Sequence, residues 1–249
     1  ISTHTTLHHM KAVILAGGFG KRLKPLTDDR PKPMVEILGK PIVAWQVEWL
    51  RLNGIYELIL CVGYMKERIM DYLGDGSKYS VSIDYVVEDE PLGTGGAVKN
   101  ARHMLKDDDK GKEEEDEDDD GYKFIVVNGD IITDLNIGKM LAFNGNSIAV
   151  VPLPSPYGIV EISNDSKIIG FKEKPKIDQF WINAGVYCLT SEVFKYLPEK
   201  GSIEYDTFPK LAADGMLYAV KYRDAYWRSI DTHKDVEEAS KELLKYKRC

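Results

Sequence analysis

The sequence is poor in cysteine and in long apolar runs, and both absences narrow the class of protein. Only three cysteines occur in 249 residues. Cys61 and Cys188 lie inside apolar, strand-like runs and Cys249 is terminal, so this odd, scattered set predicts free thiols in a reducing cytoplasm. No apolar run approaches the roughly 20 residues that a membrane-spanning helix needs, and the first residues carry no signal-peptide pattern. We therefore expect a cytoplasmic protein that makes no membrane contact.

A surplus of basic charge is also lacking. The formal net charge is −7, but residues 106–120 hold eleven acids and three bases, a local −8, so the rest of the chain sums to +1. Such a balance disfavours nucleic acid as a partner and leaves small polyanions as candidate ligands. We expect the acidic loop 106–120 to be a solvated segment entering at the N-terminal edge of the next strand; metal binding by this loop is the weaker alternative.

The first part of the chain alternates strands with helices. Residues 1–9 are rich in His and Thr and are interpreted as a cloning remnant outside the fold, so residues 10–249 form the expected single domain. Its first part, 10–147, has near-continuous apolar strands, which is typical of a mainly parallel sheet covered on both faces. Strands are predicted over 11–15, 58–62, 81–87 and 124–127, and helices over 41–52, 66–73 and 94–105.

After residue 147 the pattern changes to short strands separated by Pro, Gly and Asn-Asp turns. We predict that residues 148–249 form a smaller α+β part that lays a mixed sheet over the first. Its predicted strands are 148–151, 159–162, 168–172 and 186–189, with a helix over 192–196, further elements at 208–211 and 217–221, and a last helix over 234–246.

A glycine loop follows the first strand. Leu15 and Ala16 lead into Gly17, Gly18 and Gly20, and two cations, Lys21 and Arg22, come next. Glycines let backbone N–H groups approach a phosphate closely. The P-loop pattern fails because Gly20-Lys21 is followed by Arg22, and the dinucleotide pattern fails because its third glycine is Leu23. The loop therefore predicts another kind of phosphate-binding protein.

Two further features should meet this loop at the C-terminal edge of the sheet. The run from Gly93 to Gly96 opens a helix, and Asp130 follows the strand over 124–127. A glycine loop, a helix N-terminus and a carboxylate at neighbouring strand ends indicate a phosphate and Mg²⁺, with the carboxylate as an oxygen ligand.

These motifs resemble the signature of the sugar-1-phosphate nucleotidyltransferases over nearly the whole chain, from Met10 onward. Within that family the resemblance is strongest to the mannose-1-phosphate and heptose-1-phosphate guanylyltransferases. The motifs, in the order of that family, are Leu15-Ala16-Gly17-Gly18-x-Gly20-x-Arg22-Leu23-x-Pro25-Leu26-Thr27, Pro31-Lys32-Pro33-Met34, Pro91-Leu92-Gly93-Thr94-Gly95-Gly96-Ala97, Asn128-Gly129-Asp130, Tyr157-Gly158-Ile159-Val160-Glu161, Glu173-Lys174-Pro175 and Asn183-Ala184-Gly185-Val186-Tyr187.

The resemblance implies a Rossmann-like, GT-A-like α/β fold and transfer of a nucleotidyl group from an NTP, with GTP favoured, to a sugar 1-phosphate, releasing pyrophosphate. It implies catalytic roles for Arg22, Lys32, Asp130 and Lys174. The nucleotide is expected to contact Leu15, Ala16, Gly17, Gly18, Gly20, Arg22, Glu90, Gly93, Thr94 and Gly95, whereas the sugar phosphate is expected to contact Gly158, Glu173, Lys174 and Asn183. Without the ligand, Thr94 would serve as a helix cap; Lys21 stands where relatives carry Thr or Ser and is given no role.

One position departs from the family pattern. Most relatives carry a second metal-binding Asp in Trp-x-Asp-x-Gly-Thr, but here Ser229 stands at that Asp position and Asp231 at the glycine. We therefore predict that Asp130 and Asp231 hold the Mg²⁺.

Several alternatives stay open. The transferred group could be uridylyl, thymidylyl or cytidylyl, with glucose 1-phosphate as acceptor, and a non-catalytic regulatory paralogue is a second possibility. Many relatives carry an appended left-handed β-helix domain, which we do not expect in residues 10–249. The oligomeric state is open, with a homo-oligomer as one option.

Overall fold

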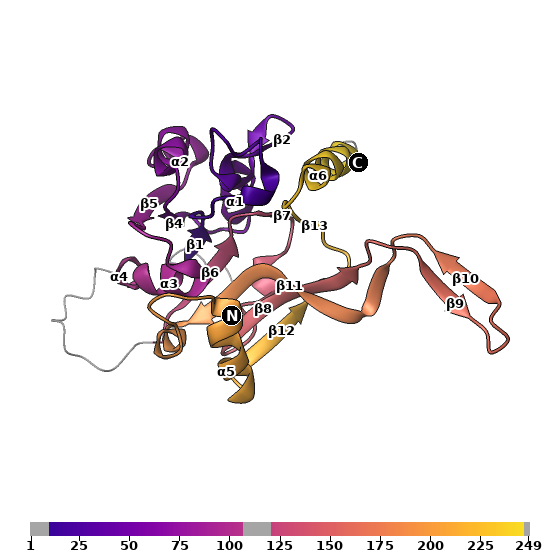
Figure 1. Ribbon diagram of the computed structural model, residues 1–249. Coiled ribbons are helices and arrows are strands. Elements are labelled where there is room, and N and C mark those ends of the chain that lie inside the picture. The colour runs from indigo at the N-terminus through magenta and orange to yellow at the C-terminus, as the bar shows by residue number, and fades with distance from the viewer. Residues whose placement is uncertain (1–9, 107–120, 247–249) are drawn as a thin grey trace.

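A seven-stranded mixed sheet forms the centre of the molecule (Figure 1). The computed structural model describes residues 10–106 and 121–246. Strands pair in the order β12-β8-β11-β6-β1-β4-β5, and every pairing is parallel except the two made by β11. The mainly parallel sheet predicted from the sequence is therefore confirmed. The strands are β1 Lys11–Leu15, β4 Glu57–Val62, β5 Ser82–Val87, β6 Lys123–Asn128, β8 Asn146–Pro154, β11 Lys176–Thr190 and β12 Leu217–Lys221.

Helices cover both faces of this sheet, which explains why its strands are apolar on both sides. Alternate residues of β1 divide between two cores: Ala12 and Ile14 pack with α1 (Ile42–Leu52) and α2 (Lys66–Leu73). On the other face, Val13 packs with α3 (Gly93–Asn100), α4 (Arg102–Leu105) and α5 (Phe208–Ala213).

A third cluster fixes the last helix, α6 (His233–Tyr246), beside the glycine loop. Leu23 and Ile42 pack there with Ile230, Ala239 and Leu243. Arg228 adds two hydrogen bonds of 2.9 and 2.6 Å to Glu242, a bidentate pairing that holds the preceding strand against α6. No helix among the described residues is long and apolar enough to cross a membrane.

The predicted second sheet layer is wrong. β8, β11 and β12 extend the same sheet beyond β6, because β11 is long enough to pair with both β6 and β8. Two other predictions differ in detail. The helix over 94–105 begins at Gly93 and breaks at Ala101, where the Asn100 carbonyl contacts the His103 ring. The predicted helix over 192–196 is a 3-10 turn, Ser191–Lys195, ended by the following Leu197-Pro198 pair.

Three small two-stranded sheets complete the fold. They are β2 Glu36–Ile37 with β3 Lys40–Pro41, β7 Ile131–Thr133 with β13 Trp227–Ser229, and β9 Ile159–Ile162 with β10 Ile168–Lys172. The β9–β10 pair projects from the body as an arm (Figure 1). Residues 107–120 of the acidic loop lie outside the described residues.

Candidate active site

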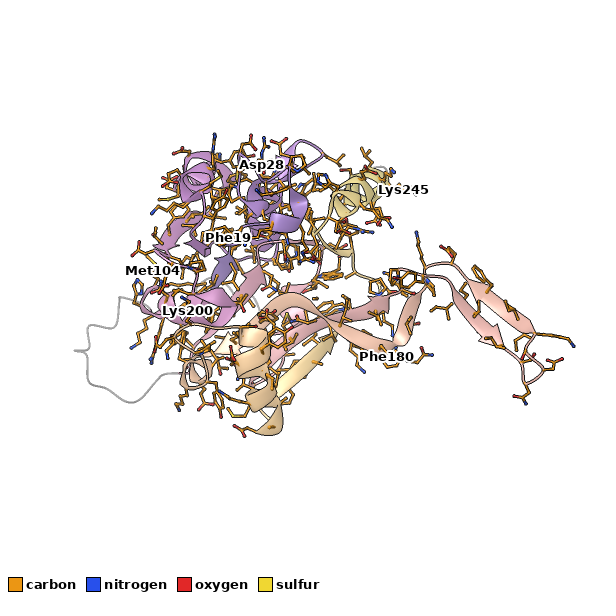
Figure 2. All side chains as sticks on the ribbon, in the orientation of Figure 1. Phe19, Asp28, Met104, Phe180, Lys200 and Lys245 are labelled. Carbon is orange, nitrogen blue, oxygen red and sulfur yellow. The ribbon has the colours of Figure 1, made fainter. Side chains whose placement is uncertain are left out.

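A cavity of about 270 Å³ opens at the C-terminal edge of the central sheet. Its wall combines the end of β1, the glycine loop, the start of α3 and the turn after β6, as predicted. We call it the main cavity; it is lined by Leu15, Gly17, Gly18, Phe19, Lys32, Pro33, Glu88, Pro91, Gly93, Thr94, Ala97, Asn128, Gly129 and Asp130. Figure 2 labels Phe19 at this edge of the sheet.

The glycine loop exposes backbone to the main cavity. A Cβ on Gly18 would meet no atom within 4 Å, so this part of the backbone is open. At Gly20 the backbone conformation and the packing both require glycine. Its φ is +62°, and a Cβ there would lie 2.8 Å from the Lys32 Cβ. The hydroxyl of Thr27 donates to the Gly20 carbonyl at 2.9 Å and fixes this close approach. The Ala16 amide, in contrast, already donates to the Cys61 carbonyl at 2.8 Å.

Four charged side chains meet at the mouth of the main cavity. The Lys32 ammonium donates to Asp130 Oδ2 at 2.7 Å and to Asp231 Oδ1 at 2.8 Å. Arg22 donates to the same Asp231 oxygen at 2.6 Å. The structure thus brings together Arg22, Lys32, Asp130 and Asp231, which the sequence separates by as many as 209 residues.

Strand pairing places Asp231 beside Asp130. β13 runs antiparallel to β7 with Ser229 opposite Ile131, and the Ile230 amide donates to the Asp130 carbonyl at 2.8 Å. Ser229 does not replace the usual carboxylate directly; its hydroxyl donates to Asp231 Oδ2 at 2.6 Å. Ser229, at the position where most relatives carry Asp, therefore orients the Asp231 carboxylate.

The same turn begins α6 and is braced by a reciprocal cap. The Thr232 amide donates to Asp235 Oδ2 at 2.8 Å, and the Asp235 amide donates back to the Thr232 hydroxyl at 3.3 Å. Burial acts to raise the pKa of Asp231, but hydrogen bonds from Lys32 and Ser229 and the nearby cations outweigh it, so the pKa lies below its ordinary value. Asp231 is thus held as a carboxylate.

Asp130 and Asp231 offer the hard oxygen donors that Mg²⁺ prefers. The described residues contain no group of three or more His, Cys, Asp or Glu side chains arranged around one point. A metal here would therefore take its remaining ligands from substrate phosphates and water, as Mg²⁺ commonly does. The donor set fits Mg²⁺, although the Lys32 ammonium lies between the two carboxylates.

The start of α3 contributes Gly93 and Thr94 to the main cavity, but Gly95 is turned away. The Gly95 amide donates to the Gly201 carbonyl at 2.9 Å, and a Cβ on Gly93 would lie 2.4 Å from that same oxygen. These glycines therefore also serve close packing against residues 198–203. The expected capping role of Thr94 is wrong, because the N-cap residue is Leu92 and Thr94 makes a different contact.

Thr94 belongs to a polar network that joins the two sides of the site. Its hydroxyl donates to Glu204 Oε2 at 2.6 Å, and Ser202 donates to the same oxygen at 2.7 Å. The Tyr187 hydroxyl donates to Glu204 Oε1 at 3.1 Å and accepts from the Asn183 amide at 2.9 Å. Sequence reasoning gave Glu204 no definite role, and the structure identifies it as the link between α3 and β11.

Replacing Glu204 with glutamine is expected to lower the free energy of unfolding at pH 7 by about 1 kcal/mol, allowing for its partial exposure. Burial acts to raise the pKa of Glu204, but hydrogen bonds from Thr94 and Ser202 bring it below its ordinary value. A lowered pKa gives stability that is full above the unfolded pKa and is lost as pH falls through the folded one. Urea unfolding at several pH values should therefore show the difference shrinking below about pH 4.5.

Glu199→Gln is the control for this measurement, because Glu199 is exposed and pairs only at the surface with Lys99. A gap between wild type and Glu204→Gln that stays constant down to pH 3 would contradict the assignment.

The expected sugar-side residues lie outside the main cavity. Asn183 is exposed, and its side-chain oxygen accepts from the Gly185 amide at 2.8 Å. Gly158, Glu173 and Lys174 lie at the base of the arm; a Cβ on Gly158 would meet Glu173 Oε2 at 2.9 Å. A second cavity of about 550 Å³, here called the outer cavity, reaches from Pro154 and Lys176 at this base to Trp227, Ser229 and Asp231.

Two polar side chains that line the main cavity, those of Glu88 and Asn128, were not predicted as site residues. Glu88 rather than Glu90 faces the glycine loop; a Cβ on Gly17 would lie 3.4 Å from Glu88 Oε1. Glu90 is exposed and accepts from Lys200 at 2.7 Å. The side-chain oxygen of Asn128 is buried and has no hydrogen-bond partner in the part of the chain that the structure describes. Strand alternation continued beyond β5 could not have singled out Glu88, because it places Glu88 and Glu90 on the same side.

Comparison with known proteins places this geometry in a family. A model of the nucleotidyl transferase family matches residues 11–246. The bifunctional protein GlmU of Methanococcus maripaludis is 38% identical over 94% of this chain and 54% of its own length. Mannose-1-phosphate guanylyltransferase of Mycobacterium tuberculosis is 33% identical over 96% of this chain and 66% of its own. The chain thus spans only about half to two thirds of these curated relatives.

A solved structure agrees with these matches. HddC from Yersinia pseudotuberculosis, complexed with GMP-PN, is 32% identical, with a TM-score of 0.71, over 94% of this chain and 99% of that chain. The resemblance seen in the sequence motifs is confirmed by both the family match and the fold. The chain belongs to the nucleotidyl transferase family.

Proposed function

We propose that this chain transfers a nucleotidyl group from an NTP to a sugar 1-phosphate. A phosphate oxygen of the sugar phosphate attacks the α-phosphorus, and the bond to the leaving pyrophosphate breaks. The observation that carries the proposal is the cluster of Arg22, Lys32, Asp130 and Asp231 at the mouth of a cavity walled by glycine backbone. Such a reaction needs two polyanions aligned and their charge neutralised, which this cluster supplies.

The nucleotide would lie in the main cavity. Its phosphates would meet the backbone of Gly17, Gly18 and Gly20 and the side chains of Arg22 and Lys32. Mg²⁺ would be held by Asp130 and Asp231 and would neutralise phosphate charge. The buried Asn128 oxygen supports a ligand at this place, since a substrate hydroxyl would give it the donor that it lacks.

The base would lie against Glu88, and this favours guanine. A carboxylate accepts hydrogen bonds, and guanine presents two neighbouring donors, its N1–H and its N2 amine, whereas uracil presents only one N–H on that edge. The relatives named mannose-1-phosphate guanylyltransferase and the HddC complex with GMP-PN support the same base. Transfer of a uridylyl, thymidylyl or cytidylyl group is the alternative.

The sugar 1-phosphate would bind across the outer cavity, next to the main cavity at Asp231. Asn183 and the arm base with Gly158, Glu173 and Lys174 border this side, and Lys174 would meet the phosphate. Mannose 1-phosphate is the favoured substrate, because several similar proteins are named mannose-1-phosphate guanylyltransferase.

We also propose a reducing, cytoplasmic location. Cys61 and Cys188 are buried, free thiols, and burial raises the pKa of Cys188 to about 11.

Pyrophosphate release tests the reaction. The chain would be assayed with Mg²⁺ and each of GTP, UTP, dTTP and CTP against mannose, heptose and glucose 1-phosphates. We expect turnover with GTP and mannose 1-phosphate. No turnover with any pair would contradict the enzymatic function and favour a nucleotide-sugar-binding regulatory protein.

Replacing Glu88 with glutamine is expected to lower kcat/KM for GTP by about 10- to 100-fold and for UTP much less, because hydrogen bonds to a charged acceptor contribute about 1.5–3 kcal/mol. Burial also raises the pKa of Glu88, so GTP use should weaken on mild acidification before UTP use does. The measurement is the ratio of the two kcat/KM values. Glu90→Gln is the control; equal effects of the two substitutions would refute the assignment of Glu88.

A further inference from the structure

The arm, defined as residues 157–174, contains a two-stranded sheet that is not part of the central one. β9 and β10 pair only with each other in the sheet topology. In the view of Figure 2 their side chains project with no other element in front of or behind them. A lone two-stranded hairpin is only marginally stable in water, so such an arm normally needs a covering surface.

One face of the arm is apolar, and the other is mixed and carries the charged side chains of Glu161 and Lys172. Phe171 pairs with Val160 and Ile168 with Ile162, and residues directly opposite each other share a face. These four form what we call the apolar arm face, and they are exposed by 64%, 41%, 65% and 63%, respectively. The opposite face carries Ile159, Glu161, Gly170 and Lys172. Alternation of this kind is typical of a sheet with one buried face.

The body of the same chain does not cover this face. β8 and β11 stay paired as far as Pro154 and Lys176, and the Ser155 amide donates to the Pro175 carbonyl at 2.9 Å. The arm therefore continues the direction of a hydrogen-bonded ribbon, away from the central sheet (Figure 1). Folding it back would break this pairing.

We propose that the apolar arm face docks against the same face of a second copy of this chain, in a two-fold symmetric dimer. Charge favours this partner: residues 157–174 hold three acids and three bases, so two arms meet without the repulsion expected from a chain of net charge −7. An isologous contact also requires only one self-complementary patch.

The area is sufficient for such a dimer. The apolar arm face, with the neighbouring Tyr157 and Ile169, offers six exposed side chains at roughly 100 Å² each. Two copies would then bury about 1,200 Å², the lower end of specific interfaces. Because Glu173 and Lys174 directly follow β10, the dimer would also hold the arm base in place beside the outer cavity.

Sedimentation velocity over a concentration series tests the proposal with two adjacent substitutions. Val160→Glu and Ile159→Glu change neighbouring residues that are both 41% exposed but lie on opposite faces. We expect wild type to dimerise with a micromolar or tighter Kd. Val160→Glu should weaken the dimer at least about 100-fold, and Ile159→Glu should change it little.

Amide hydrogen exchange gives a second measurement that does not depend on activity. Exchange of residues 159–172 in wild type should slow as protein concentration rises, and it should not do so in Val160→Glu. A wild type that stays monomeric at about 100 μM would overturn the proposal. Equal effects of the two substitutions would also overturn it, whether both proteins dimerise or neither does. Docking of a different protein on the arm would then be the remaining explanation.

Discussion

Replacing Lys32 with methionine is expected to lower kcat/KM for nucleotidyl transfer by about 10³-fold. It should at the same time tighten Mn²⁺ binding to the nucleotide-free protein by roughly tenfold or more, where a tenfold change is about 1.4 kcal/mol. The reason for both is the position of Lys32, whose side chain is only 13% exposed and whose ammonium group lies within 2.8 Å of both Asp130 and Asp231. It neutralises two carboxylates that would otherwise attract a divalent cation. Without it, the carboxylates are free for metal but the phosphates lose a fixed positive charge.

Steady-state turnover and Mn²⁺ titration by electron paramagnetic resonance measure the two effects separately. Lys24→Met is the control, because Lys24 is exposed and pairs only with Asp28. If Lys32→Met binds Mn²⁺ no more tightly than wild type, the two carboxylates do not form the metal site. If it retains normal turnover, the catalytic assignment of Lys32 is wrong.

The cluster around Lys32 shows which parts of the candidate site could be predicted from the sequence. Arg22, Lys32 and Asp130 stand in local motifs whose chemistry is readable from glycine, proline and strand ends. Asp231 was predicted in spite of a departure from the family pattern. Its neighbour Ser229 then proved to orient it, which depends on the register of β13 against β7, about a hundred residues away in sequence. Side-chain pairing of this kind is set by tertiary contacts that no local pattern contains.

The fold shows the same division. The strands at 11–15, 159–162 and 168–172 were predicted with their observed bounds, because alternation and turn residues mark them locally. That β8, β11 and β12 join the central sheet, and that β9 and β10 leave it, was not predictable. Those outcomes depend on which strands form hydrogen bonds with one another, and this pairing is set by the tertiary structure. Glu88 was missed for a related reason: burial by the glycine loop, and not its own sequence context, makes it part of the main cavity.

Replacing Arg22 with alanine is expected to lower kcat by about 10²- to 10⁴-fold with a smaller change in KM for the nucleotide. The side chain is 74% exposed and reaches Asp231 from the 3-10 turn that follows Gly20. From there a guanidinium can contact triphosphate oxygens with several donors at once. Charge that moves onto the leaving pyrophosphate would be stabilised more in the transition state than in the bound substrate, so kcat carries most of the loss.

The adjacent cation provides the control for Arg22. Lys21 points toward the Phe19 ring, with its ammonium 5.8 Å from the ring centre, so Lys21→Ala should change kcat less than about threefold. Thermal unfolding should be nearly unchanged in both variants, because an exposed ion pair such as Arg22–Asp231 contributes at most about 1 kcal/mol. Near-normal turnover of Arg22→Ala, or equal losses in the two variants, would mean that the loop supplies only a general positive field. A loss confined to Arg22 requires a directed contact with the triphosphate.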